Sequence, residues 1–341
     1  MRTHPLVAAW QLQAYFLREK MKLIIQIPCF NEEATLTQTY NDLPKAIEGI
    51  DCIETQIIDD GSTDRTVEVA RQLGIDHIIS FKQNKGLAAA FRAGVANAVL
   101  HGADILVNTD GDNQYAGADI PKLIGPVVRG EADMVIGARP INDHPEFSFL
   151  KKRLQNIGSW TLRKVSNTSV PDAASGFRAY SKDALMHINV FSDFSYCMET
   201  LIQAGHNNLK IQSVDIRVNS KTRESRLFRN IPQYVFRSAK TIVHIFLLYR
   251  SGQVFSALSV LLFLAAVAVV LRYFFLMIFY QTPGNVFWPS IILASTLLTT
   301  SFISYLVGII CSLIAANRKL LEEVLYRLRV SESKSRKNED S

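Results

Sequence analysis

Two aspartates separated by one glycine stand in the first half of the chain, directly after an apolar segment. Residues 104–109 (DILVNT) have the pattern of a buried strand, and residues 110–114 (DGDNQ) follow them. Two carboxylates at a strand end can both project into the crevice beyond a parallel sheet, where they suit a divalent cation that also contacts a diphosphate. Gly111 would let a ligand approach the backbone, and Gln114 could add a neutral oxygen. The alternative is a polar turn held by Asx hydrogen bonds, but the position after a strand favours a metal site.

Two other apolar segments also end in acidic residues. Residues 57–64 (IIDDGSTD) run from a strand pattern into a helical one, and a carboxylate there could accept hydrogen bonds from a nucleobase N–H. Ser62 or Thr63 could instead merely cap the helix, although capping and base recognition use different groups. In residues 28–33 (PCFNEE), Phe30 could pack on a base and Glu32 could hold a ribose or base. Taken alone, this last segment would be an ordinary loop and helix start.

These acidic segments need a scaffold that gathers strand ends, and the pattern between residues 21 and 224 predicts one. Short apolar runs alternate with helical patterns at short intervals, which indicates an α/β domain with a mostly parallel sheet covered on both faces. The predicted strands are 22–28, 54–60, 76–81, 104–109 and 133–137, and the predicted helices are 32–48, 63–73, 86–102 and 121–129.

The C-terminal third has a different composition. Residues 254–279 and 288–315 are two apolar segments of 26 and 28 residues, and between 254 and 315 Arg272 alone is charged. A bilayer core needs about 20 residues, so the pair predicts two transmembrane helices; a buried core helix is the alternative. Apart from Arg272, the basic residues of this region lie outside the hairpin, which predicts that the large domain and the tail (316–341) are cytoplasmic, at the cell membrane, by the positive-inside rule.

A basic segment joins the α/β domain to the hairpin. Residues 216–250 contain eight Lys or Arg residues and one acid, Glu224. Within them, 225–250 has apolar residues at helical spacing, which predicts an amphipathic helix on an anionic membrane surface; an ordinary surface helix is the alternative. Basic clusters beside apolar spans do not suggest a nucleic-acid partner.

The ends of the chain and its cysteines add little to this organisation. Residues 1–20 form an N-terminal extension without the pattern of a signal peptide, and translation could start at Met1 or Met21. Four cysteines without paired spacing suit reduced thiols in the cytosol.

The motifs taken together, in their order along the chain, resemble those of family 2 glycosyltransferases with the GT-A nucleotide-sugar fold. The resemblance is strongest to the polyprenyl-phosphate sugar synthases, of the dolichyl-phosphate mannose synthase and undecaprenyl-phosphate glucosyltransferase types. It covers residues 22 to about 225 and, for the bacterial relatives, the two-helix C-terminus. The segments that carry it are 28–33, 59–66, 84–87, 110–114, 136–139 and 175–178.

The resemblance implies a role for each of several groups of residues. Nucleotide-sugar contacts fall to Pro28, Phe30, Glu32, Asp59, Asp60, Lys85, Asp110, Gly111, Asp112 and Arg139. A Mg²⁺ or Mn²⁺ ion would be held by Asp110, Asp112 and Gln114. Acceptor or phosphate contacts fall to Ser175, Arg178, Lys221, Arg223 and Arg226, and the catalytic set is Asp112, Asp172 and Arg178. Relatives often carry Ala and Leu where this chain has Gly111 and Asn113, which leaves the ligand positions intact.

The implied reaction is inverting transfer of a sugar from a nucleotide-diphosphate donor to a polyprenyl phosphate, undecaprenyl or dolichyl. The product would be a lipid-linked phosphosugar for cell-envelope glycan or glycoprotein assembly. One alternative is a family 2 enzyme whose acceptor is diacylglycerol or a glycan hydroxyl, with Asp172 as base. The other is a non-catalytic membrane scaffold of the same fold. The sugar, the base, the choice of metal and a homo-oligomer formed through the hairpin all remain open.

Overall fold

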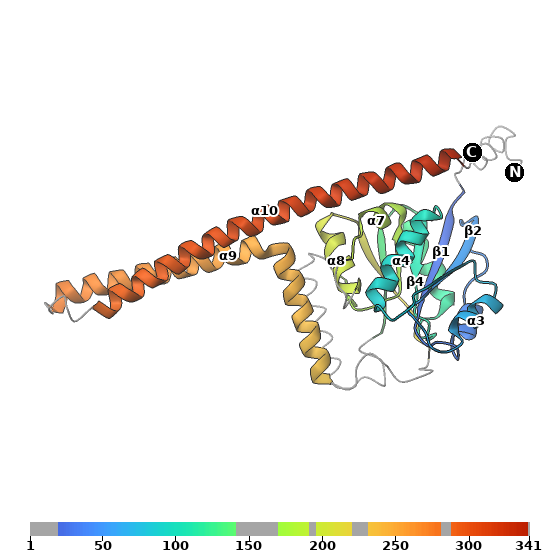
Figure 1. Ribbon diagram of the computed structural model, residues 1–341, viewed down its shortest axis with the longest axis horizontal. Coiled ribbons are helices and arrows are strands. Elements are labelled where there is room, and N and C mark those ends of the chain that lie inside the picture. The colour runs from blue at the N-terminus through green and yellow to red at the C-terminus, as the bar shows by residue number, and fades with distance from the viewer. Residues whose placement is uncertain (1–19, 141–169, 191–195, 220–230, 281–287, 340–341) are drawn as a thin grey trace, which may run out of the picture. The chain divides into compact units, whose positions relative to one another are not determined.

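The computed structural model describes residues 20–140, 170–190, 196–219, 231–280 and 288–339 (Figure 1). Within these ranges, side chains of 231–239, 241–250, 280 and 333–339 are not described. Two compact units divide the chain. One holds Met1–Ser238 together with Tyr326–Ser341, and the other holds Ala239–Leu325.

A seven-stranded mixed sheet forms the centre of the first unit. Its order is β3-β2-β1-β4-β6-β5-β7, and only β6 runs antiparallel to its neighbours among the described strands. The strands are β1 (Lys22–Cys29), β2 (Cys52–Asp59), β3 (His77–Ser80), β4 (Ile105–Asn108), β5 (Met134–Ala138), β6 (Arg178–Ser181) and β7 (Ile211–Asp215). The mostly parallel sheet is therefore confirmed, whereas the antiparallel β6 was not predicted.

Short helices connect the strands. They are α2 (Leu36–Asn41), α3 (Thr66–Gln72), α4 (Leu87–Leu100), α5 (Ile120–Val128), α7 (Lys182–His187) and α8 (Tyr196–His206), with a 3₁₀ turn, η1, at Gly117–Asp119. The helix predicted over 32–48 is wrong in length, because α2 ends at Asn41. Pro44 follows closely and disfavours helical backbone at the residue before it. The other predicted helices agree with the structure within about three residues at each end.

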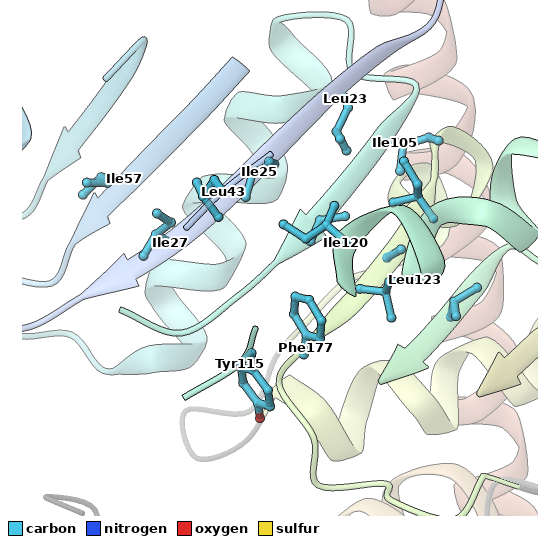
Figure 2. Packing of buried hydrophobic residues seen from close by; sticks show 14 of the residues in the cluster. Leu23, Ile25, Ile27, Leu43, Ile57, Ile105, Tyr115, Ile120, Leu123 and Phe177 are labelled. Carbon is cyan, nitrogen blue, oxygen red and sulfur yellow. The ribbon is translucent and has the colours of Figure 1, made fainter. Parts of the chain in front are cut away.

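Side chains along each strand alternate between the two faces of the sheet, and a packed core lies on each face. On one face, Leu23, Ile25 and Ile27 of β1 join Ile57 and Ile105 in a cluster that α5 covers (Figure 2). On the opposite face, β1 and β2 pack against α4. Each fully buried aliphatic side chain of this kind contributes ~1.5–3 kcal/mol relative to an exposed one. The predicted covering of both faces is thus confirmed.

Two long helices form the C-terminal part of the described chain, α9 (Ile231–Tyr280) and α10 (Trp288–Glu339). Within them, Ser251–Phe279 and Trp288–Glu332 are long and apolar enough to cross a membrane. The predicted spans 254–279 and 288–315 lie inside these limits. The predicted interfacial segment is helical from residue 231 onward, and its amphipathic character stays a prediction because most of its side chains are not described.

The predicted tail at 316–341 is helical as far as Glu339, and its part from Tyr326 onward belongs to the first unit. The Arg329 guanidinium donates to the carbonyl oxygens of Met186 (3.0 Å) and Ile188 (3.1 Å), just where α7 ends. It also donates to Asn189 Oδ1 at 2.8 Å, and the Tyr326 ring stacks on His187 with ring centroids 4.1 Å apart. This part of α10 therefore folds with the first unit.

Candidate active site

The three acidic segments predicted from the sequence meet at one edge of the sheet. Cys29 at the end of β1 pairs with Asp59 at the end of β2, and Gln26 of β1 pairs with Asn108 at the end of β4. Arg178, the first residue of the antiparallel β6, pairs with Asn108 at the same edge. The carboxyl ends of three parallel strands and the start of β6 therefore surround one site, as expected of ligand crevices in open α/β sheets.

The loop that holds Asp110 and Asp112 is fixed from α2. The carbonyl oxygen of Gly111 accepts hydrogen bonds from Thr35 Oγ1 (2.8 Å) and Thr39 Oγ1 (3.1 Å). These two hydroxyls are four positions apart and so lie on one helix face. Sequence reasoning missed them, although that spacing was visible. They set the direction of the peptide between the two aspartates.

Gly111 is required by packing against the end of β1. A Cβ atom there would lie 3.2 Å from Glu32 Cγ and 3.3 Å from both Cys29 Sγ and the Pro28 carbonyl oxygen. The glycine therefore lets the 110–114 loop pack closely against the end of β1. The expected approach of a ligand to the Gly111 backbone stays a prediction. An alanine would demand a shift of a few tenths of an ångström.

Asp110, Asp112 and Gln114 are the predicted ligands of a divalent cation. All three are half-buried, and Asp112 Oδ1 accepts a hydrogen bond from the Gln114 backbone N–H at 3.1 Å. In the described part of the chain, no group of three or more His, Cys, Asp or Glu residues could hold a metal by itself. Two carboxylates and an amide oxygen suit Mg²⁺ or Mn²⁺, which share their remaining positions with water and phosphate oxygens.

The loops after β1 and β2 are tied together by side chains. Asn31, with φ of 58°, donates its backbone N–H to Ser62 Oγ (2.8 Å) and accepts from the Thr63 N–H through Oδ1 (2.8 Å). The Phe30 ring is 39% exposed beside this junction, whereas Pro28 and Glu32 are buried. An exposed aromatic ring next to a fixed loop offers a surface for a nucleobase.

Asp59 and Asp60, adjacent in sequence, hold two different segments. Asp59 is buried and accepts from the Ser62 N–H (3.0 Å) and Ser80 Oγ (2.6 Å), so it shapes the turn. Asp60 accepts from the N–H groups of Lys85 (2.7 Å) and Gly86 (2.9 Å). Burial raises the pKa of Asp60, although those two amides lower it. The Lys85 ammonium is exposed and lies 4.8 Å from the centroid of the Phe81 ring.

Arg139 and Asp172 form a bidentate ion pair on the other side of the site. Arg139 Nε lies 2.7 Å from Asp172 Oδ2, and Arg139 Nη2 lies 3.1 Å from Oδ1. Burial alone would lower the pKa of Arg139, but Tyr115, Asp172 and Asp110 raise it, so the guanidinium stays charged. Because both Asp172 oxygens contact Arg139, the structure places Asp172 as a partner that orients Arg139. The role of Asp172 as a base, expected only for a hydroxyl acceptor, stays a prediction.

Arg178, which was expected to contact the acceptor, is fully buried. Its side chain is 0% exposed and donates to the carbonyl oxygens of Ser175 (2.8 Å), Ala173 (2.7 Å) and Cys197 (2.8 Å). It also donates to Thr200 Oγ1 at 2.9 Å. The Arg178 guanidinium ties the 172–178 loop to α8 in this structure, and its contact with the acceptor stays a prediction. Sequence cannot distinguish such a buried arginine from an exposed one.

Ser175 and Tyr115 lie where the 110–114 loop, which holds the predicted metal ligands, meets the 172–178 loop. Ser175 is fully buried, and its Oγ has no hydrogen-bond partner among the described residues. The Tyr115 hydroxyl accepts from the Gly176 N–H at 3.2 Å, and its ring stacks on Phe177 (Figure 2). Tyr115 was missed in the sequence, although it directly follows Gln114. Lys221, Arg223 and Arg226 lie outside the described residues.

Comparison with known proteins connects this geometry to a chemistry. A profile of Glycosyl transferase family 2 matches residues 24–188. The chain is 34% identical over 216 residues to the UDP-N-acetylglucosamine–dolichyl-phosphate N-acetylglucosaminyltransferase of Methanococcus voltae, covering 56% of this chain and 83% of that protein. It is 29% identical over 199 residues to the dolichol-phosphate mannosyltransferase of Pyrococcus furiosus, covering 55% of this chain and 54% of that one.

Solved structures share the fold at lower identity. Glucosyl-3-phosphoglycerate synthase from Mycobacterium tuberculosis, in complex with Mn²⁺, UDP and glucosyl-3-phosphoglycerate, superposes with a TM-score of 0.51 at 20% identity. The match covers 67% of this chain and 79% of that one. The expected GT-A fold is therefore confirmed.

Proposed function

Because the chain belongs to glycosyl transferase family 2, we propose that it transfers a sugar from a nucleotide-diphosphate donor to a polyprenyl phosphate at a membrane surface. Its family and the glycosyltransferase names of its relatives identify it as a hexosyltransferase. The observation that carries the proposal is the joining, in one chain, of the Asp110–Asp112 site with two helices long and apolar enough to cross a membrane. The names of the Methanococcus and Pyrococcus relatives support a polyprenyl-phosphate acceptor.

The donor would bind across the ends of β1, β2 and β4. Phe30 supplies an exposed ring for the base, and Asp60 fixes the Lys85–Gly86 segment that borders it. Asp110, Asp112 and Gln114 would hold Mg²⁺ or Mn²⁺ against the diphosphate. When bound, the cation stabilises the negative charge that gathers on the leaving nucleoside diphosphate.

On the acceptor side, the residues would act by positive charge more than by removal of a proton. A lipid phosphate is already ionised at neutral pH, so positioning matters more than proton removal. The Arg139 guanidinium, kept charged and oriented by Asp172, suits binding of a donor or acceptor phosphate. Both carboxylate oxygens of Asp172 contact Arg139, so this carboxylate is less suited to act as a base for a hydroxyl acceptor, which supports the lipid phosphate over diacylglycerol or a glycan. In-line attack would invert the anomeric centre.

The membrane part would keep this site beside its lipid substrate. We propose that the catalytic domain and the tail lie in the cytoplasm, which the basic residues on the domain side of the hairpin support. The segment 225–250 would then lie at the headgroup level, with Lys221, Arg223 and Arg226 close to lipid phosphates.

The test uses membranes that contain the full-length protein, a panel of radiolabelled nucleotide sugars, and mass measurement of the lipid product. Asp110→Asn and Asp112→Asn should each lower transfer by at least ~100-fold, because each removes a carboxylate from the cation. Glu68→Gln on α3 is the matched control, since Glu68 is exposed and should leave transfer unchanged.

Binding measurements separate the remaining alternatives. Calorimetric titration of the wild type with UDP or GDP should show affinity that depends on Mn²⁺ or Mg²⁺. A scaffold that kept only the fold would show none. Unchanged transfer in both aspartate variants would instead rule out this metal site.

A further inference from the structure

A row of buried amide side chains crosses the sheet on the face that packs against α4. Gln56, Gln26 and Asn108 sit side by side at one register of β2, β1 and β4, and all three are 0% exposed. Gln56 Nε2 donates to Gln26 Oε1 (2.9 Å), and Gln26 Nε2 donates to Asn108 Oδ1 (2.8 Å). The three amides therefore form a chain of hydrogen bonds that runs in one direction.

Both ends of this amide row have defined partners. At one end, Gln56 accepts from Asn97 Nδ2 of α4 (2.9 Å) and donates its other hydrogen to the Gly94 carbonyl oxygen (2.8 Å). At the other end, Asn108 Nδ2 donates to the Gly176 carbonyl oxygen (3.0 Å) and to the Tyr196 hydroxyl (2.9 Å). An amide NH₂ group has two hydrogens, so the donors of Gln56 and Asn108 are fully used. The orientation of each amide is thereby fixed by its neighbours.

The helix that covers the row is shaped to it. A Cβ atom on Gly94 of α4 would lie 2.0 Å from Gln26 Oε1 and 2.8 Å from Ile58 Cδ1. No side chain fits there without displacing Gln26 or the helix. The glycine lets the α4 backbone itself accept a hydrogen bond from the row.

Stability alone does not require this arrangement. The interior strands of a parallel sheet are normally apolar on both faces, and replacing buried polar groups by apolar ones of similar shape is often neutral or stabilising. A fully satisfied buried network instead rigidifies its surroundings and selects one arrangement. The row ends at Gly176, where a Cβ atom would lie only 3.2 Å from Asp110 Oδ1 and 3.0 Å from the Tyr196 hydroxyl oxygen. The last hydrogen bond of the row, donated by Asn108, therefore ends on the Gly176 backbone, which lies close to the Asp110 carboxylate.

We propose that Asn108 is a positioning residue for the metal site, and that Gln26 and Gln56 hold its amide in the required orientation. Asn108 keeps the Gly176 carbonyl and the Tyr196 hydroxyl in place, and the Gly176 backbone then limits where the Asp110 carboxylate can move. This inference rests on the proposed function, because there Asp110 is a ligand of the cation.

The experiment compares the two ends of the row in the full-length protein. Asn108→Ala and Asn97→Ala each remove one side-chain amide from the network, but only Asn108 touches the 172–178 loop. For both variants we would measure the unfolding free energy, kcat, KM for the nucleotide sugar, and the Mn²⁺ concentration that half-saturates binding of UDP or GDP. Asn108→Ala should lower kcat about tenfold, the ratio that ~1.4 kcal/mol produces, and raise the Mn²⁺ requirement several-fold. Asn97→Ala should leave both within about twofold.

A milder variant protects the test against loss of folding. Tyr196→Phe removes the hydroxyl that Asn108 holds, while its ring keeps the stack on Phe91 at 4.2 Å between centroids. It should raise the Mn²⁺ requirement in the same direction by a smaller factor.

Two outcomes would overturn the proposal. One is an equal effect of Asn108→Ala and Asn97→Ala per folded molecule, and the other is an unchanged Mn²⁺ requirement in both Asn108→Ala and Tyr196→Phe. Failure of the proposed function would look different. Wild-type protein that bound nucleotide with Mn²⁺ but transferred no sugar would refute the proposed function alone, because the Mn²⁺ comparison would still decide the role of Asn108. Wild-type protein without metal-dependent binding would overturn both.

Discussion

The sheet domain and the helical hairpin place their large apolar side chains in opposite positions. In the sheet domain Leu23 and Leu106 are 0% exposed, whereas in the hairpin Leu264 is 60% and Phe279 is 69% exposed. The buried positions of the hairpin are small instead, with Ala266 at 0% and Ser301 at 5% exposed. The described part of the hairpin therefore turns its large apolar side chains outward, whereas the sheet domain buries them.

Polar groups follow the same division. In the hairpin, Ser301 Oγ donates to the Ser259 carbonyl oxygen at 2.9 Å, and a Cβ on Gly252 would lie 2.2 Å from Ser312 Oγ. Such contacts bring two helix backbones together where no hydrophobic force acts between them. In the sheet domain, buried hydroxyls and amides fix the loops of the site. Buried polar groups therefore allow close packing of helices in the hairpin, whereas in the sheet domain they position the loops of the site.

The strongest test of the comparison replaces one leucine in each unit. Leu106→Ala should lower the unfolding free energy of the sheet domain by ~2–5 kcal/mol, because it leaves a cavity in a close-packed core. Leu264→Ala should have little effect on packing, since that side chain already faces outward. Denaturant unfolding in detergent measures both. Equal losses would show that the hairpin is an ordinary soluble core.

A charge on the outer face of the hairpin should be the next most costly change. Leu264→Arg places a guanidinium within the first predicted span, at a cost of ~2.5–3.5 kcal/mol for insertion. Leu320→Arg is the control, because Leu320 is as exposed but lies beyond the second predicted span. Carbonate extraction of membranes reports the fraction inserted. Normal insertion of Leu264→Arg would contradict a transmembrane role for 254–279.

A bulky residue at the hairpin interface should matter more than one beside it. Ser301→Leu should destabilise the helix pair by ~1–3 kcal/mol through overpacking. Thr300→Leu should change little, because Thr300 is exposed. Resistance of the packed hairpin to SDS, followed by circular dichroism and crosslinking, gives the measurement. The packing would be misassigned if Thr300→Leu proved the more disruptive.

The loop-fixing hydroxyls of the sheet domain allow a comparison within one short helix. Thr35→Val or Thr39→Val removes a hydrogen bond to the Gly111 carbonyl, at about 1 kcal/mol each, and should raise the half-saturating Mn²⁺ concentration about fivefold. Thr37→Val is the matched control, since Thr37 is exposed on the same helix. Metal titration of nucleotide binding measures all three. A shift in the control equal to that in the other two would refute a positional role for the hydroxyls.

The smallest expected effect concerns pH. Burial would raise the pKa of Asp119, but hydrogen bonds from Arg217 lower it below its ordinary 3.8. A lowered carboxyl pKa stabilises the fold above 3.8, and this contribution disappears as the pH falls through the folded-state value. Asp119→Asn should therefore be slightly less stable than wild type at neutral pH, and the difference should shrink at an acidic pH below 3.8. Denaturant unfolding at both pH values tests this, and a difference that grows in acid would contradict it.

Much of the fold and of the site's location could be predicted because both follow from local pattern. Apolar runs followed by Asp59 or Asp110 place strand ends, and parallel strands bring those ends to one edge. The antiparallel β6 could not be predicted, since its four residues (RAYS) carry no strand pattern and its partners are distant in sequence. The helix predicted from 32 was too long, because Pro44 disfavours helical backbone at the residue before it.

The functions of individual side chains were harder to predict than their location. Arg178 belongs to a recognisable segment, yet its guanidinium donates to backbone carbonyl oxygens. These bonds depend on how α8 packs, so the sequence does not reveal them. The amide row was invisible for a similar reason. Gln26 and Gln56 become neighbours only once the β1–β2 register is known. Burial and register are long-range properties, so sequence spacing cannot report them.

One measurement tests the proposed reaction most directly. Purified full-length protein would be placed in vesicles containing either a polyprenyl phosphate or the same polyprenol without its phosphate, and supplied with nucleotide sugars and Mn²⁺. Mass analysis of the lipids should show a sugar added to the polyprenyl phosphate and none added to the alcohol. Equal transfer to the alcohol, or no transfer to the phosphate with any nucleotide sugar, would contradict the proposal.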